Sequence, residues 1–173
     1  MPAPEAISAA LEAVGAPFEI IDVDPRLADT DNFCLHYSYS PEDSANTIIV
    51  RTKTGERRYA ACVLLSTCRL DVNRTVRKRL EARKVSFAPE SETTELTGMV
   101  SGGVTPIGLP ADWPIWVDPR VMARERIILG GGSRNCKVIE GPGYLQALPQ
   151  VVIVDGLANV HDLTQAHIQT LAR

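Results

Sequence analysis

The sequence predicts a mixed α/β (α+β) fold: a single domain with a twisted, partly barrel-like mixed sheet surrounded by short helices. Three observations lead to this prediction. The chain of 173 residues has the length of one domain. Its 45% hydrophobic and 23% charged residues are typical of a folded globular protein. Helix-like and strand-like segments alternate along the sequence, and each is short. We expect one domain over 1–173, with a core from about 6 to 148 and a C-terminal extension over 149–173.

The N-terminal segments alternate between the two periodicities. Apolar residues at helical spacing predict a helix over 6–14, which Gly15 ends. The apolar run at 18–23 predicts a strand. A second helix is expected over 28–37, with its start near Asp29.

A hairpin and a helix follow. The β-rich segments 47–52 and 58–65 are joined by Lys53-Thr54-Gly55-Glu56, a sequence typical of a hairpin turn. Asp71 is a suitable N-cap for a helix over 71–80 that carries its apolar residues inward.

The second half contains two stretches rich in glycine, Ser101–Gly108 and Gly130–Asn135, which suit neither helix nor strand. Short regular elements surround them. Strands are expected at 85–87, 115–117, 126–129 and 136–139, and helices at 89–96 and 144–148. The apolar run Val151–Val154 suits a buried strand, and the tail from Asp162 to Ala172 suits a last helix.

Charge is distributed unevenly. The net charge of −3 excludes a uniformly basic nucleic-acid binder. The window 51–84, however, carries eleven basic and three acidic residues, a net charge of +8. Such an asymmetry indicates either a polyanionic partner or a solvated helix face, and Arg74, Arg77 and Lys78 lie in a helical pattern within the window.

The sequence lacks the patterns of membrane-spanning, secreted and metal-binding proteins and of common nucleophile motifs. No apolar run is long enough to span a membrane, and the start MPAPEAISAA lacks the features of a secretory signal, so we expect a cytoplasmic location. The four cysteines form no CxxC pair, and the spacing of His161 and His167 does not suit a shared metal ion, so no metal or other cofactor is expected. No nucleophile elbow or phosphate-binding GxxxxGK sequence is present.

The two glycine-rich stretches are the best candidates for a site. Glycine lets bare backbone N–H groups approach a ligand closely, and such donors can hold a carbonyl or a developing oxyanion. The alternative is two tight turns without a site. Asp118, which lies between them in sequence, is either a site residue or a structural anchor at a strand end.

The first stretch carries a family resemblance. Gly102-Gly103-Val104-Thr105-Pro106-Ile107-Gly108 resembles the GGxxPxG motif of the YbaK/EbsC-type aminoacyl-tRNA deacylases, free-standing relatives of the editing domain of prolyl-tRNA synthetases. The segment Ile128–Arg134 resembles the second glycine loop of that family, and the resemblance covers roughly residues 6–148.

The resemblance implies an activity and a set of site residues. Family members hydrolyse the ester between a small, wrong amino acid and the terminal adenosine of a tRNA, often tRNA for proline, without a metal or a covalent enzyme nucleophile. The predicted substrate-binding residues are Thr105, Pro106, Asp118, Gly131, Gly132, Ser133 and Arg134. Backbone donors of Gly102 and Gly103 would activate the ester. The basic residues Arg74, Arg77 and Lys78 would contact the tRNA backbone.

One departure from the family concerns the catalytic cation. Many members carry a lysine in a Lys-Thr-apolar motif, where this chain reads Asn46-Thr47-Ile48. Some members have an acidic residue where this chain has Lys137, so one hypothesis is that the cation has moved across the pocket. Alternatives are a catalytically silent relative that binds tRNA or a synthetase, and a small-molecule-binding protein.

Overall fold

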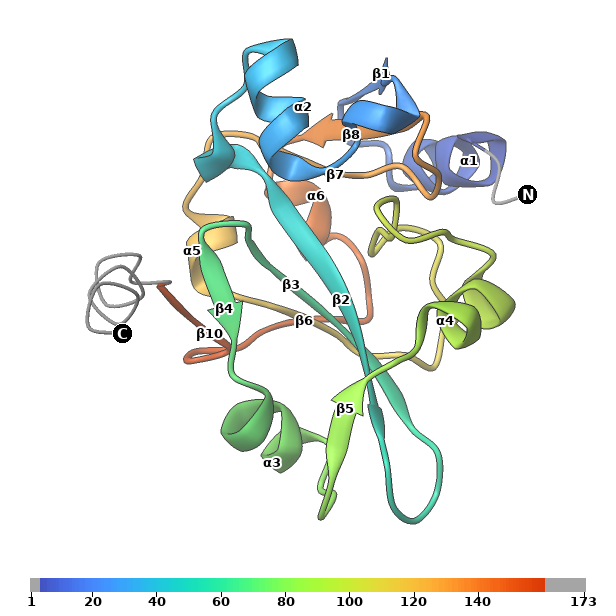
Figure 1. Cartoon of the computed structure of the whole chain (residues 1–173), viewed down its shortest axis with the longest axis vertical. Helices are drawn as coiled ribbons and strands as arrows, with labels where there is room; N and C mark the ends of the chain where they lie inside the picture. Colours follow the sequence, from blue (N-terminus) through green and yellow to red (C-terminus); the bar gives the residue numbers. More distant parts are fainter. Residues whose placement is uncertain (1–3, 161–173) are drawn as a thin grey trace, which may run out of the picture.

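Two sheets and a β-ribbon form the framework of the computed structural model, which describes residues 4–160 (Figure 1). The strands are β1 (Phe18–Asp22), β2 (Ala45–Thr52), β3 (Tyr59–Leu65), β4 (Cys68–Leu70), β5 (Val85–Phe87), β6 (Ile115–Val117), β7 (Ile127–Gly130), β8 (Cys136–Glu140), β9 (Val151–Ile153) and β10 (Ala158–Val160). The helices are α1 (Pro4–Val14), α2 (Thr30–Tyr37), α3 (Arg77–Arg79), α4 (Glu90–Thr97), α5 (Pro119–Met122) and α6 (Gly143–Gln146). Short helical turns are η1 (Pro25–Leu27), η2 (Pro41–Asp43) and η3 (Val72–Val76), the last of which has a π-helical pattern.

The larger sheet has the strand order β5-β2-β3-β6-β9. β2 pairs antiparallel with β3 and β5, whereas β6 runs parallel to both β3 and β9. Every residue of β3 after Tyr59 is buried, as is all of β6, because these strands have packed layers on both faces.

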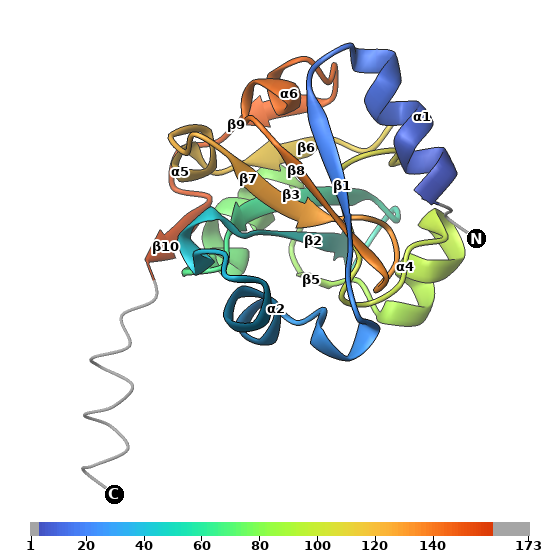
Figure 2. The same cartoon turned by 90° about the horizontal axis from the view of Figure 1, so that it is seen from above.

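The smaller sheet, β1-β8-β7, is antiparallel and lies over one face of the larger sheet (Figure 2). The main core fills the space between the two sheets, with Ile49, Val63 and Val117 from one and Leu129 and Val138 from the other. α1 and α6 close the sides of this layer with buried apolar residues.

Two smaller clusters cover the outer faces. Under the larger sheet, Val76 and Leu80 pack against Val50 and Trp116, which anchors α3. Above the smaller sheet, Phe33 of α2 packs with Ile128 and Ile139 among others. The result is a layered α/β domain whose twisted sheets remain open, with no closed barrel among residues 4–160.

The predicted mixed α/β fold is therefore confirmed, although the sheets do not close as far as a barrel. Two strands, β9 and β10, come from the segment predicted as a C-terminal extension and pair with β6 and β4. The segment predicted as a buried strand at 151–154 does contain a strand, β9, but the predicted burial is wrong for two of its residues. Val152 and Ile153 are exposed because β9 is an edge strand. The helix predicted for 162–172 lies outside the described residues, and within them no helix is long and apolar enough to cross a membrane.

Candidate functional site

A cavity of about 420 Å³ opens between the two sheets and α2, on the edge of β2 that β3 does not cover. Its volume is in the range typical of small-ligand sites. It is lined by Ala28, Asp29, Thr30, Ser44, Ala45, Asn46, Thr47, Ile48, Ile49, Phe87, Ala88, Glu90, Thr93, Ser101, Gly102, Val104, Gly130 and Lys137.

The exposed edge of β2 supplies one wall. Ser66 N–H donates to the Ser44 carbonyl and Thr52 N–H donates to the Arg58 carbonyl, so the even-numbered residues of β2 exchange hydrogen bonds on the β3 side. In an antiparallel pair the intervening residues point their backbone groups the other way. β5 covers that edge only from residue 50 onward, so Thr47 presents its backbone toward the cavity.

Thr47 also contributes a side-chain hydroxyl without a partner. Its Oγ1 is buried and makes no hydrogen bond to any described residue. Buried polar atoms are nearly always satisfied, and an unsatisfied one costs about 1–3 kcal/mol. An unpaired hydroxyl on a cavity-lining residue is therefore consistent with a ligand contact at this wall.

Asn46 and Lys137 line the same cavity from different sheets. Asn46 is an exposed residue of β2. Lys137 of β8 is 7% exposed, and its Nζ lies 5.0 Å from the centroid of the Phe33 ring. The two residues that the sequence analysis treated as alternative positions for one catalytic group are thus brought together.

Lys137 is a buried cation without a carboxylate partner. No ion pair or hydrogen bond joins its ammonium to any residue of the described chain. Burial lowers the pKa of Lys137, and the neighbouring Cys34 and Asp29 only partly offset this effect. An ammonium ion with spare donors in a low-dielectric pocket can stabilise negative charge that develops on a ligand.

The two glycine loops pack against each other and are joined by backbone hydrogen bonds. Gly132 N–H donates to the Gly103 carbonyl at 2.6 Å, and Val100 N–H donates to the Gly132 carbonyl at 3.2 Å. A Cβ on Gly103 would meet the Ser133 carbonyl carbon at 2.6 Å, and a Cβ on Gly130 would meet the Val104 oxygen at 2.5 Å. The glycines therefore allow close backbone approach between the loops.

Gly102 and Gly103 consequently differ in position. Gly102 has a φ of 82°, is exposed and lines the cavity. Gly103 is buried, does not line the cavity, and donates its N–H to the Val100 carbonyl at 2.9 Å. The expectation that Gly103 points a free backbone donor into the pocket is thus corrected, because this N–H closes a turn.

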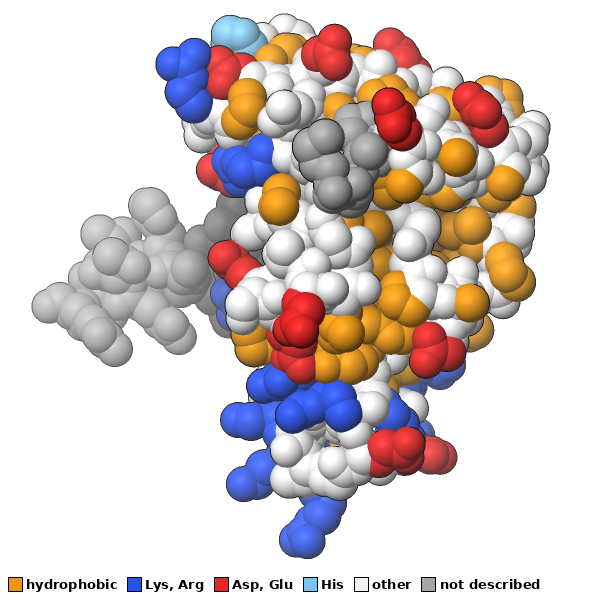
Figure 3. Space-filling model, turned by 90° about the vertical axis from the view of Figure 1, so that its right-hand side faces the viewer, with side chains coloured by type: hydrophobic (Ala, Val, Ile, Leu, Met, Phe, Trp, Pro, Cys, Tyr) orange, Lys and Arg blue, Asp and Glu red, His pale blue; other side chains and the backbone are white. Residues whose placement is uncertain are grey.

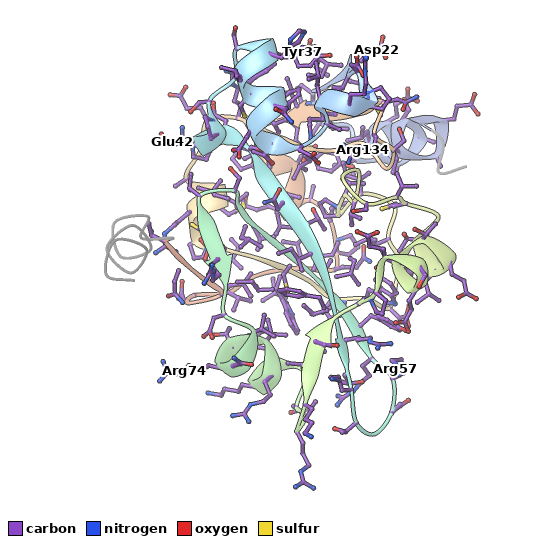
Figure 4. All side chains as sticks on the ribbon, in the orientation of Figure 1. Asp22, Tyr37, Glu42, Arg57, Arg74 and Arg134 are labelled. Carbon is purple, nitrogen blue, oxygen red and sulfur yellow. The ribbon has the colours of Figure 1, made fainter. Side chains whose placement is uncertain are left out.

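The residues predicted to bind substrate from the second loop do not line the cavity, although the Arg134 guanidinium lies against Gly102, which does. Gly131 and Gly132 are buried, and Ser133 Oγ accepts from Asn135 N–H. Arg134, labelled in Figure 4, donates from Nε to the Pro25 carbonyl and from its Nη atoms to Asp29 Oδ1. Arg134 therefore ties the second glycine loop to the segment preceding α2.

Three further residues predicted to bind substrate also lie outside the cavity lining. Thr105 and Pro106 are buried next to Val104 and do not line the cavity, and Thr105 Oγ1 is unpaired among the described residues. Asp118 is completely buried at the end of β6, where its carboxylate accepts from Arg120 N–H at 2.9 Å and from Ala158 N–H at 3.1 Å. These bonds make Asp118 an anchor for α5 and β10, and it does not line the cavity.

Basic side chains gather at the opposite end of the larger sheet, as the blue surface in Figure 3 shows. Figure 4 shows Arg74 and Arg57 at this lower end, away from Arg134. A shallow hollow there is lined by Lys53, Asn73, Arg77, Arg83, Lys84 and Val85, and a neighbouring one by Arg74, Arg77, Lys78, Glu81, Ala82 and Arg83. Within residues 4–160, none of the lysines and arginines in these hollows forms an ion pair.

Several cavity residues were not predicted from the sequence. Asp29 and Thr30 begin α2, and Phe87, Glu90 and Thr93 come from β5 and α4. Only the pairing of β5 with β2 brings the last three to the site. The described part of the chain contains no cluster of three potential metal-ligating side chains, and His161 and His167 lie outside it.

Comparisons with known proteins agree with this geometry. The family model of the aminoacyl-tRNA editing domain matches residues 24–148. A crystal structure of hypothetical protein APE2540 superposes with a TM-score of 0.78 at 23% identity, over 89% of this chain and 99% of that one. A proposed trans-editing enzyme for prolyl tRNA synthetase gives 0.77 at 18% identity, over 90% and 96% of the two chains.

The same fold also occurs inside a larger protein. A proposed signal transduction protein from Marinobacter aquaeolei VT8 gives a TM-score of 0.61 at 19% identity, over 98% of this chain but 35% of that one. These likenesses establish the shared fold, and the family match spans most of this chain, including both glycine loops and every residue of the cavity wall. The chain belongs to the aminoacyl-tRNA editing domain family.

Proposed function

We propose that this protein is a trans-editing deacylase, which hydrolyses the ester between a small amino acid and the 3′-terminal adenosine of a mischarged tRNA, with tRNA for proline or a similar tRNA as substrate. The observation that carries the proposal is the buried ammonium of Lys137, which forms no ion pair with a described residue and lines the same cavity as Asn46. Family membership supports the reaction class.

Ester hydrolysis needs stabilisation of an oxyanion and an oriented ribose. A water molecule, or a nucleophilic group of the substrate, attacks the ester carbonyl carbon, and the carbonyl oxygen takes up negative charge. The C–O bond to the ribose then breaks, and the ribose oxygen leaves with a proton. The Lys137 ammonium would stabilise the oxyanion, while the Asn46 amide would orient a ribose hydroxyl.

The choice of a small amino acid rests on family resemblance and not on the volume of the cavity, because about 420 Å³ is enough for an aminoacylated ribose. Small apolar side chains are also those that a synthetase cannot reject by binding alone. The backbone wall formed by Thr47 and Gly102 provides hydrogen-bonding groups without adding side-chain bulk.

A second candidate function follows from Asn46. If Lys137 does not replace the missing lysine, the chain would be a silent relative that binds tRNA or a synthetase. A deacylation screen over tRNAs charged with alanine, cysteine, serine and threonine separates the two. Hydrolysis of any of these by the wild type, lost in Lys137→Ala, supports the deacylase. Tight, salt-sensitive tRNA binding without hydrolysis supports the silent relative.

A further inference from the structure

Phe87 is an exposed aromatic residue at the rim of the cavity. It ends β5, lines the cavity, and has 56% of its surface exposed. A single exposed apolar residue is common on protein surfaces, and what distinguishes Phe87 is that its aromatic ring belongs to a residue that lines a ligand-sized cavity.

The sheet places Phe87 on the same face as Asn46. Phe87 is paired with Val50 of β2, and cross-strand partners point to the same face. Because side chains alternate along a strand, Asn46 and Ile48 share that face with Val50. Ile48 is the diagonal cross-strand neighbour of Phe87 on this face. Its apolar side chain therefore lies between Asn46 and the aromatic ring.

β5 also joins the cavity to the basic end of the molecule. Val85 lies two residues before Phe87 on the same face, about 7 Å along the strand. Val85 lines the hollow formed with Lys53, Arg77, Arg83 and Lys84. The strand therefore leads from the basic hollow at Val85 to the rim of the cavity at Phe87. Figure 1 shows β5 at the lower end of the sheet, and Figure 3 shows basic side chains gathered at that end.

The charges around Phe87 favour a base over a phosphate. Glu90 lines the cavity next to Phe87, and Asp29 lines it from α2. Asp29 is paired with Arg134, whereas Glu90 forms no ion pair with a described residue and therefore repels a phosphate beside Phe87. The hollow at the start of β5 attracts phosphates instead. An uncharged, planar group is the partner that fits between the two regions.

We propose that Phe87 stacks against a base of the single-stranded 3′ end of the tRNA, while the basic hollow holds phosphates further along that strand. This inference rests on the proposed function and assigns a positioning residue to it. A basic groove combined with an aromatic platform is the general arrangement by which proteins hold single strands without reading their sequence.

The test uses a short single-stranded RNA that ends in CCA, with 2-aminopurine in place of the terminal adenine, and the full chain. Stacking on an aromatic ring quenches 2-aminopurine fluorescence. We expect quenching by wild type and by Phe87→Trp. Phe87→Ala and Phe87→Leu should weaken binding roughly tenfold, since base stacking is worth on that order, and should abolish the quenching. The leucine variant keeps apolar contact but lacks a π face.

Leu96→Ala is the matched control, because Leu96 is also an exposed apolar residue but lies on α4 and does not line the cavity. The salt dependence of binding should stay unchanged in Phe87→Ala, which separates stacking from phosphate contact. Wild-type affinity and quenching in Phe87→Leu would overturn the inference, as would failure of the wild type to bind the RNA. A wild type that binds and quenches but hydrolyses no charged tRNA overturns the proposed function and leaves the stacking role intact.

Discussion

Lys137 of β8 and Asn46 of β2 line one cavity, although they belong to different sheets. The lining of this cavity thus combines a buried cation with a neutral amide. Positive charge would come from β8 in place of the lysine of the family's Lys-Thr-apolar motif on β2, and its function can be tested at both positions.

Lys137→Ala should lower the rate of deacylation about 10²- to 10³-fold, the usual cost of removing a preorganised group that stabilises an oxyanion. Single-turnover rates on a charged tRNA measure the effect. If the cation has been moved, Asn46→Lys in the Lys137→Ala background should restore part of the rate, because it returns positive charge to the cavity. Asn46→Gln in the same Lys137→Ala background is the control that adds no charge. An unchanged rate in Lys137→Ala would contradict this role.

The effect of Lys137 should also depend on pH. Burial lowers the pKa of this lysine below its ordinary value of 10.5, so the ammonium loses its proton at a lower pH than an exposed lysine. The ratio of wild-type to Lys137→Met rates should therefore fall as the pH rises toward 10, with the decline starting before an exposed lysine would titrate. A ratio that stays constant over this range would show that the charge of Lys137 does not matter.

Gly103→Ala should destabilise the protein and abolish deacylation together. Its Cβ would collide with the Ser133 backbone and force the two glycine loops apart. Thermal unfolding followed by circular dichroism should show a lower Tm. Gly143→Ala is the control, because a Cβ there meets no atom within 4 Å and its φ is not left-handed. An unchanged Tm in Gly103→Ala would mean that the loops can separate freely.

Glu140 should make stability depend on pH. Its carboxyl is buried in the core without a hydrogen-bond partner among the described residues, and burial raises its pKa to about 8 from 4.5. Between these values the folded chain keeps a proton that the unfolded chain releases, so this residue makes stability fall as the pH rises. Glu140→Gln should be more stable than wild type at pH 8, and the difference should shrink toward pH 4.5. Urea unfolding at several pH values measures it.

Arg77→Gln with Lys78→Gln should weaken tRNA binding regardless of sequence and reduce the slope of log affinity against log salt, because phosphate contacts release counterions. Arg69→Gln is a useful control. Arg69 belongs to the same basic window but lies on β4, outside the basic hollows. Equal effects of the control and the double variant would show that net charge alone matters.

Local patterns predicted much of the fold. The hairpin around Gly55 and the helix stop at Gly15 depend on residues adjacent in sequence, and both occur where expected. β5 and β6 were predicted although each has three residues, but the equally short β4 and β10 were missed. Their existence depends on pairing with each other across the chain, which a local pattern does not encode.

The site was predictable only where a motif marked it. Gly102 and Lys137 were found from the family's loops and do line the cavity. Phe87 and Asp29 were not found, because their place at the site depends on how β5 and α2 dock on the sheets. Asp118 was predicted as a site residue but has a structural role. A charged residue at a strand end is typical of a site, and only its hydrogen bonds to backbone N–H groups show that it anchors the chain.

The pairing of β1 with β8 has a consequence for biosynthesis. β1 leaves the ribosome long before its partner, β8, because most of the described chain lies between the two strands. Likewise, the outer edge of β6 stays unpaired until β9 has been synthesised. Neither sheet can therefore be completed before β8 and β9 have been synthesised, and the hairpin of β2 and β3 is the first part able to form native pairs. The apolar strands made earlier need protection until then.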